Sequence, residues 1–110
     1  MEFPRIITDL PEAEMPFPST VVKTHVLRTD QGQLIFFEIL KDIDAPPHAH
    51  KGQWGTVLEG EVELTIGGKT QVFRPGGSYY IPAGISHSAR IPAGVKMIEF
   101  FEDPDRYRVK

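Results

Sequence analysis

Three histidines and one glutamine are the residues of this sequence whose types and spacing could do chemistry. His48 and His50 are one residue apart, and on a β-strand residues i and i+2 point to the same face, so their imidazoles can share one ion. Gln53 follows across the step Lys51–Gly52, where glycine lets the chain bend back toward the same pocket and the amide oxygen can join the set. His87 belongs to another segment and completes the set only where the two segments face each other. These four side chains are therefore candidate ligands of one divalent transition-metal ion per chain, although local spacing alone does not establish that His87 faces the others.

The ligand types restrict the metal and its chemistry. The chain has no cysteine, which excludes disulfides, thiolate metal sites and cysteine nucleophiles. Nitrogen and oxygen donors fit manganese, iron, nickel or zinc, and the ligands alone do not choose among them. Three imidazoles and an amide carry no charge, so a bound ion keeps its full double charge and acts as a stronger Lewis acid. The set therefore favours polarisation of a carbonyl or hydroxyl group over activation of oxygen.

Short strands must position these residues, because ten prolines and ten glycines divide the chain into segments too brief for most helices. Alternating polar and apolar residues around Gly67–Gly68 predict a tight hairpin, and residues 29–32 predict another turn. We expect strands at 21–27, 33–40, 61–66, 69–73, 78–81, 86–91 and 95–101. Residues 1–20 are expected to form an arm with an edge strand near its start, and residues 21–110 a barrel, all within one domain. The sequence thus predicts the all-β class.

Two segments carry a resemblance to a known family. Residues 47–60, with the His-x-His pair, Gln53 and Gly60, resemble the first motif of the cupins. Residues 76–87 are similar to the second motif, with its glycine, its Pro-x-Gly and its final histidine in place. The resemblance covers roughly residues 21–101 and is to a small single-domain cupin of the cupin 2 conserved-barrel type. It implies a cupin jelly-roll β-barrel, or double-stranded β-helix, with the metal inside.

The sequence departs from the common cupin pattern in three places. Gln53 replaces the usual glutamate, the spacing from His50 to Gln53 is one residue shorter, and Ile91 stands where asparagine is frequent. Some small cupins, similar to the pectin-degradation proteins that linearise unsaturated uronates, also use glutamine. Ile91 lies four residues after His87, so on one strand both side chains point to the same face. We therefore expect Ile91 to give the pocket an apolar floor that suits a partly apolar ligand.

Candidates for moving a proton lie in the second motif and after the last predicted strand. Tyr79 and Tyr80 are adjacent, so one of them must point inward, although alternation alone does not say which. Asp103 begins residues 103–107, a segment that either closes over the barrel mouth or frays into solvent. The candidate catalytic residues are Tyr80 and Asp103.

Three other residues receive structural interpretations. His25 is a surface histidine or a hydrogen-bonded core residue, as single histidines usually are. Trp54 is expected in the core, because a residue directly after Gln53 on a strand points to the opposite face, away from the metal pocket. Arg90 lies three residues after His87, so on one strand it points to the opposite face. A salt bridge or solvent contact is expected for it.

Composition limits the partners. Twelve basic and fifteen acidic residues leave a net charge of −3, and no basic cluster exceeds the loose tail at 106–110, which argues against nucleic acid. No apolar run approaches the roughly 20 residues of a membrane span, and the first five residues are acidic and broken by proline, unlike a secretory signal. We expect a cytoplasmic protein that contacts no membrane. A homodimer is expected, in which the N-terminal arm and an exposed sheet face pack against the partner.

Three functions are open at this point. The first is a metal-dependent enzyme of isomerase or lyase type, acting on a small polar metabolite such as a sugar acid or keto compound. The second is a non-catalytic module that binds a small molecule. The third is an iron-dependent dioxygenase, because the ligands do not identify the metal.

Overall fold

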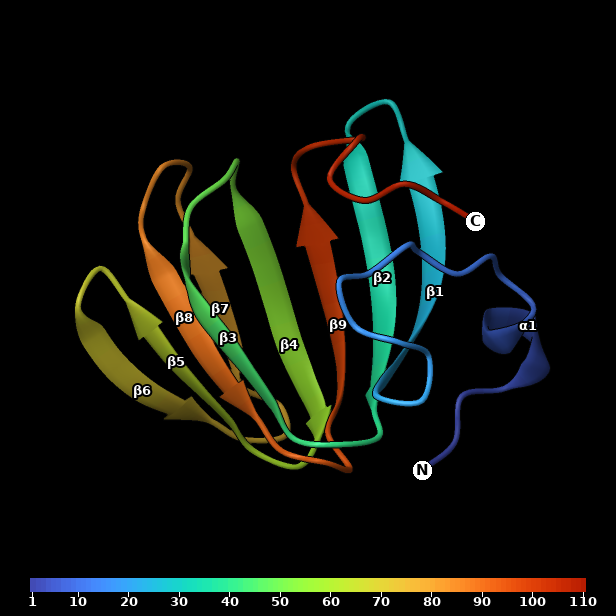
Figure 1. The fold of residues 1–110 in the computed structure, drawn as a ribbon, viewed down its shortest axis with the longest axis horizontal. Helices are drawn as coiled ribbons and strands as arrows, with labels where there is room; N and C mark the ends of the chain where they lie inside the picture. Colours follow the sequence, from blue (N-terminus) through green and yellow to red (C-terminus); the bar gives the residue numbers. More distant parts are fainter.

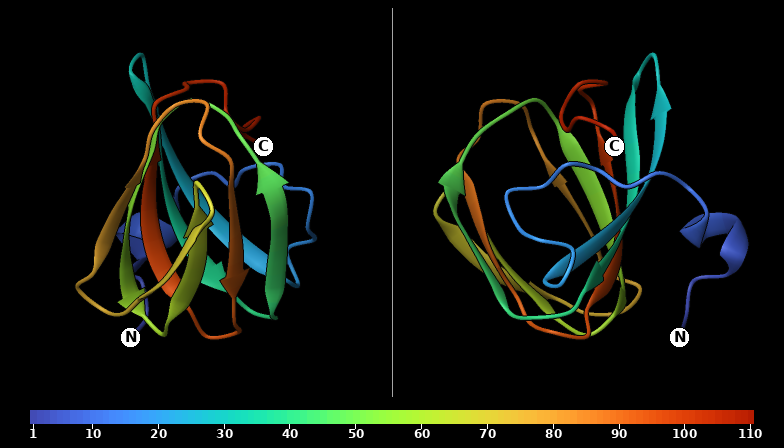
Figure 2. Two further views of the ribbon diagram at one scale, coloured as in Figure 1. Left: turned by 90° about the vertical axis from the view of Figure 1, so that its left-hand side faces the viewer. Right: turned by 45° about the vertical axis from the view of Figure 1, so that its right-hand side comes forward.

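Nine strands form two antiparallel sheets that face each other in the computed structural model, which describes residues 1–110 (Figures 1 and 2). The larger sheet has the strand order β1–β2–β9–β4–β7, and the smaller has the order β3–β8–β5–β6. The strands are β1 (Val22–Thr29), β2 (Gly32–Ile39), β3 (Ile43–His48), β4 (Gln53–Glu59), β5 (Val62–Ile66), β6 (Lys69–Phe73), β7 (Ser78–Ile81), β8 (His87–Ile91) and β9 (Lys96–Phe101). The arrangement confirms the predicted all-β jelly-roll barrel.

The chain crosses repeatedly between the two sheets, so segments distant in sequence become neighbours. In the larger sheet β9 lies between β2 and β4, and in the smaller sheet β8 lies between β3 and β5. Figure 1 shows β3 in green running beside β8 in orange, and the two strands pair antiparallel. This pairing brings the end of the first histidine segment next to the start of the second.

Both predicted hairpin turns are present. The β1–β2 ladder closes at Thr29 and Gly32. The β5–β6 ladder closes around Gly67 and Gly68, whose φ angles are +56° and +85°. Two consecutive positive φ values are what the tight two-residue hairpin turn requires, and glycine adopts them without steric cost.

Two strands were missing from the sequence prediction. β3 contains two consecutive prolines, which remove backbone donors and conceal the strand pattern. β3 pairs only with β8 and lies at the edge of the smaller sheet, where prolines are tolerated. β4 begins directly at Gln53 and was concealed by the glycines around the first motif.

The predicted edge strand near the start of residues 1–20 is wrong. Residues Arg5–Thr8 form one turn of helix, α1, after Pro4, whose carbonyl accepts hydrogen bonds from the backbone N–H groups of Ile7 and Thr8. Further along, Ala13 forms an isolated bridge with Val109 and is 2% exposed. The arm is therefore partly built into the barrel.

The core lies between the two sheets, and the outer face of the larger sheet is unusually apolar. Ile35, Ile81 and Val57 are almost completely buried between the sheets. The expectation that Trp54 is a core residue is wrong, because it is 42% exposed on the outer face. It belongs to a row that crosses all five strands in register: Leu27, Leu34, Phe100, Trp54 and Tyr80.

The predicted homodimer stays a prediction.

No helix in the structure is long and apolar enough to cross a membrane.

Candidate metal centre

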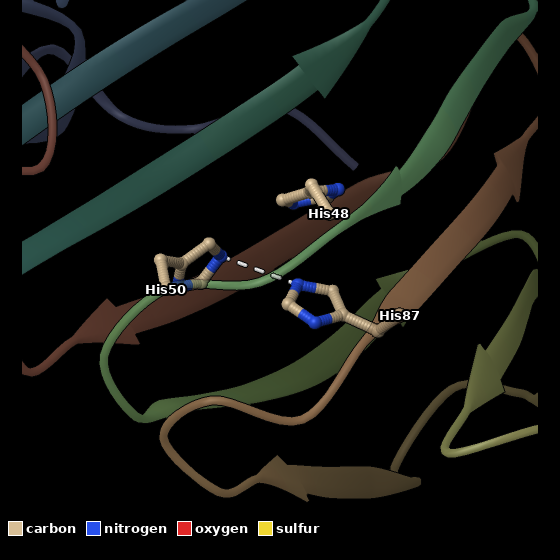
Figure 3. Close-up of side chains that lie close together, drawn as sticks. All are labelled: His48, His50 and His87. Carbon is tan, nitrogen blue, oxygen red and sulfur yellow. Dashed lines mark hydrogen bonds between the residues drawn. The ribbon is translucent and has the colours of Figure 1, made fainter.

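The three predicted histidines converge, and the pairing of β3 with β8 is the reason. His48, the last residue of β3, is the register partner of His87, the first residue of β8. His50 lies two residues beyond His48 in the loop before β4 rather than on a strand, yet its ring turns toward the same point (Figure 3). The ring centroids are 4.2 Å apart for His48 and His87, 4.8 Å for His50 and His87, and 5.2 Å for His48 and His50. One ligand atom from each histidine lies within 4.8 Å of the others, so the three can surround one ion.

Each of these rings is held by a backbone carbonyl on its Nδ1 side. The distances are 2.9 Å from His48 to the oxygen of Pro46, 2.7 Å from His50 to that of Lys51, and 2.9 Å from His87 to that of Ile85. A carbonyl oxygen can only accept, so each Nδ1 carries the proton and donates it. In a neutral ring the lone pair is then on Nε2, which is the arrangement typical of metal-binding histidines.

The Nε2 atoms of His50 and His87 are 3.2 Å apart, as the dashed line in Figure 3 marks. With both Nδ1 atoms protonated, two lone pairs face each other, and this arrangement needs a positive species nearby. A proton is disfavoured, because burial lowers the pKa of both rings and the charge of Arg106 lowers it further. The donor chemistry therefore fits a divalent transition-metal ion.

Gln53 presents a free amide oxygen to the same cavity. It is the first residue of β4, 8% exposed, and its Nε2 donates a short hydrogen bond to Glu99 Oε2. A carboxylate oxygen accepts this bond, which fixes which end of the amide is nitrogen. The opposite end, Oε1, is buried and has no hydrogen-bond partner. An unpaired buried acceptor is costly, and a bound cation would satisfy it.

Glu99 lines the same cavity and is not among the residues that the sequence analysis names. It lies on β9, is 6% exposed, and accepts a 2.6 Å hydrogen bond from the Tyr79 hydroxyl on the same Oε2. Burial raises the pKa of this carboxyl, and the hydrogen bonds from Tyr79 and Gln53 partly offset the rise. A signal was present: Glu99 shares strand parity with Met97 and Phe101, so an acidic residue stands among positions that face the core.

The comparisons with known proteins agree with this geometry. The family model for the cupin domain matches residues 35–101, well over half of the chain. The chain belongs to the cupin family. This cupin is similar in structure to an RmlC-like cupin from Shewanella frigidimarina NCIMB 400, with 26% identity over 89% of this chain and 87% of the other, and a TM-score of 0.73. No match was found among curated proteins.

Two further solved structures share the fold of this cupin. KdgF from Halomonas sp. is 19% identical over 86% of this chain and 88% of its own, with a TM-score of 0.69. Oxalate decarboxylase from Bacillus subtilis, which has Mn(II) centres, is 16% identical over 90% of this chain and 29% of its own, also with a TM-score of 0.69. At these identities the likeness is one of fold.

The tyrosine that faces the cavity in this cupin is Tyr79 rather than Tyr80. Tyr79 is 5% exposed, whereas Tyr80 is 61% exposed on the outer face of the sheet. The reason lies on the paired strand: Gly55 is opposite Tyr79, and a Cβ on Gly55 would lie 2.5 Å from the tyrosine ring. Trp54 is opposite Tyr80 instead. Glycine thus leaves the space that one tyrosine needs, and Tyr80 does not reach the site.

Asp103 does not reach the cavity either, but the segment that follows it does. Asp103 accepts a hydrogen bond from the backbone N–H of Asp105 at 2.9 Å. Arg106 and Tyr107 both line the cavity, so the segment closes over the barrel mouth and does not fray. Gln33, which is completely buried, holds it there through hydrogen bonds to the backbone of Pro104 and Tyr107.

The structural interpretations of three other residues are confirmed. Ile91 lines the cavity as an apolar residue. His25 is 4% exposed and forms a 2.7 Å hydrogen bond with Glu38, and neither residue lines the cavity. Arg90 is exposed, and its Nε lies 3.8 Å from carboxylates of Asp44 and Glu63.

The cavity itself has a volume of about 100 Å³. Its lining is mostly apolar, and the polar groups are few: the three histidines, Gln53, Tyr79, Glu99, Arg106 and Tyr107. A small apolar chamber with a few convergent polar groups is typical of a binding site for a small molecule.

Proposed function

We propose that this cupin binds one divalent transition-metal ion through His48, His50, His87 and Gln53, and is an enzyme of isomerase or lyase type. Its substrate is a small polar metabolite that carries a carbonyl or hydroxyl oxygen. The observation that carries the proposal is the buried, unpartnered Oε1 of Gln53 in the cavity where three histidines turn their Nε2 atoms toward one another. An ion bound by these neutral ligands would supply Lewis-acid polarisation of the substrate oxygen.

The buried pair Tyr79–Glu99 is the group best placed to hold or move a proton. Both hydrogen bonds to Glu99 end on Oε2, so Oε1 is left for a ligand in the cavity. A carboxyl whose pKa is raised by burial is a stronger base when ionised, and it is closer to its protonated form near neutral pH. Glu99 can therefore accept a proton from a polarised substrate, with Tyr79 stabilising the carboxylate by its hydrogen bond.

The surrounding apolar side chains support the same chemistry. A mostly apolar lining lowers the effective dielectric constant of the cavity, and charges interact more strongly there. Oxalate decarboxylase, which shares the fold, has Mn(II) centres. This likeness supports metal chemistry on a small oxygen-rich substrate in a barrel of this kind.

The test is metal analysis followed by a turnover screen. The purified protein is stripped with a chelator, reloaded with manganese, iron, nickel or zinc, and incubated with keto acids and uronates while NMR follows the substrate and an electrode follows oxygen. We expect conversion of at least one compound that needs the metal, is abolished in Glu99→Gln, and consumes no oxygen. Oxygen uptake that matches turnover would identify a dioxygenase instead. Binding without conversion by any loaded form would identify a non-catalytic binding module.

A further inference from the structure

Arg106 is a charged group at the cavity that the metal centre does not use. Its guanidinium carbon lies 4.4 Å from the ring centroid of Tyr107 and 5.8 Å from that of Phe101, so two aromatic rings hold the side chain in place. Its Nε is buried and has no hydrogen-bond partner, although the residue lines the cavity. A buried N–H on a permanent cation has a strong requirement for an acceptor.

No carboxylate of the chain forms an ion pair with Arg106. The ion pairs of the structure involve five other arginines and lysines, and none of them includes Arg106. Glu99 is the one carboxylate that lines the cavity. Its Oε2 accepts the hydrogen bonds from Tyr79 and Gln53, and it forms no ion pair with Arg106. Arg106 lines the same cavity as the three histidines, so its charge lies close to the histidine cluster.

Charge balance leads to the type of ligand. The neutral histidines and Gln53 contribute no charge, a divalent ion and Arg106 bring three positive charges, and Glu99 brings at most one negative charge. A chamber that keeps an excess of positive charge in apolar surroundings favours an anion. Arginine is also the side chain whose planar fork matches a carboxylate with two parallel hydrogen bonds.

We propose that Arg106 binds the carboxylate of a small 2-oxo or 2-hydroxy acid, and so orients its second oxygen toward the histidine cluster. This assignment rests on the proposed function, because it names the substrate class of that site. The cavity of about 100 Å³ is smaller than the pockets that hold drug-sized ligands, which suits an acid of a few carbon atoms. Arg106 is then a substrate-binding residue that distinguishes acids from neutral carbonyl compounds of the same shape.

The test compares matched ligands on the metal-loaded protein. Pyruvate and hydroxyacetone share a three-carbon keto frame and differ in the carboxylate, and glycolate and ethylene glycol form a second pair. Calorimetry and ligand NMR should show that the wild type binds each acid more tightly than its neutral partner. Arg106→Gln should weaken binding of the acids by at least about tenfold, which corresponds to 1.4 kcal/mol, and leave binding of the neutral compounds unchanged. Arg108→Gln, an exposed arginine in the same segment, is the matched control and should change neither.

Arg106→Lys keeps the positive charge but loses the planar guanidinium fork, so it should bind the acids with intermediate affinity. The thermal unfolding midpoint shows whether Arg106→Gln folds. If it does not fold, Arg106→Lys provides the test. Equal weakening of acids and neutral compounds, or unchanged affinity for the acids, would overturn the assignment of Arg106. Metal stoichiometry is measured on each sample and separates the two proposals. Full metal content and turnover with no role for Arg106 would overturn this inference alone. Failure to bind metal, with selectivity for acids retained through Arg106, would overturn the proposed metal enzyme alone.

Discussion

The inner and outer faces of the strands β4, β7 and β9 contrast sharply, although they are made from consecutive residues. Inside, Gln53, Tyr79 and Glu99 are between 5% and 8% exposed and form one hydrogen-bonded group. Outside, Trp54 and Tyr80 are 42% and 61% exposed and are paired across neighbouring strands. The usual barrel places apolar residues inside and polar residues outside, so this part of the sheet reverses the expected pattern.

The reversal separates the part of the barrel that supplies the hydrophobic core from the part that we propose binds a ligand. Apolar strands such as β2, with Ile35 and Phe37 inside, supply the hydrophobic core. The inward polar group contributes little hydrophobic stabilisation, and one of its atoms, Gln53 Oε1, has no partner within the chain. Buried polar groups of this kind are retained where a ligand uses them.

The largest expected effect follows from breaking the hydrogen-bonded group of Gln53, Tyr79 and Glu99. Glu99→Gln should lower metal affinity by about 10- to 100-fold, the usual cost of losing a residue that orients a ligand. A glutamine at position 99 can donate as well as accept, so it no longer fixes the amide of Gln53 with Oε1 free. Competition with a chelator measures the affinity.

Phe100→Leu, one residue further along β9, is the matched outer-face control and should keep the affinity of the wild type. If Glu99→Gln also kept it, Glu99 would have no part in positioning Gln53.

The next effect follows from filling the space that Gly55 leaves. Gly55→Ala should destabilise the fold by about 1–3 kcal/mol, because the added methyl group would lie 2.5 Å from the Tyr79 ring. Urea unfolding gives the free energy. Combining Gly55→Ala with Tyr79→Leu should cost clearly less than the sum of the two single changes, because the shorter side chain removes the clash. Additive costs would show that Gly55 and Tyr79 do not oppose each other.

Sequence reasoning reached the parts of the site that local spacing defines. His48, His50 and His87 follow from two short motifs, and the all-β barrel follows from turn residues and alternation. Glu99 was missed because its partner Gln53 is 46 residues away, and the pairing of β4 with β9 is a property of the fold. The choice between Tyr79 and its neighbour likewise depended on a glycine in another strand.

One further omission and one choice that the sequence left open have the same origin. The prolines of β3 concealed a strand that is stable only because β8 pairs with it at the sheet edge. The C-terminal segment is ordered over the cavity by Gln33, a buried side chain more than 70 positions away in sequence. Long-range pairing of this kind has no local signature.

A smaller effect concerns pH, because two histidines of the cluster and Glu99 change the stability with opposite signs. The pKa of His50 and His87 is lowered below the usual 6.5 by burial, so their contribution to stability is present above pH 6.5 and is lost as the pH falls. The pKa of Glu99 is raised above the usual 4.5, so the folded state takes up its proton first and gains stability as the pH falls.

Glu99→Gln removes the second contribution. The metal-free variant should therefore lose thermal stability more steeply than the metal-free wild type between pH 7.5 and 4.5. Unfolding midpoints at three pH values measure both curves. Parallel curves would contradict the opposing signs.

The smallest effect is expected on the outer face. Tyr80→Thr should change the free energy of unfolding by no more than about 0.5 kcal/mol and leave metal content and turnover unaltered, because the side chain is 61% exposed and lies outside the site. Chemical unfolding and metal analysis check both statements. A loss of turnover in this variant would restore Tyr80 as the catalytic tyrosine and remove the contrast between the two faces.

Metal stoichiometry tests the central claim most directly. Elemental analysis of the chelator-stripped and reloaded protein should give about one divalent ion per chain, and almost none for His48→Ala or His87→Ala. His25→Gln, which alters a buried histidine outside the cavity, should keep the stoichiometry of the wild type. The bound ion should also raise the thermal unfolding midpoint of the wild type, because it binds only the folded state. Unchanged metal content in both alanine variants would contradict the metal centre.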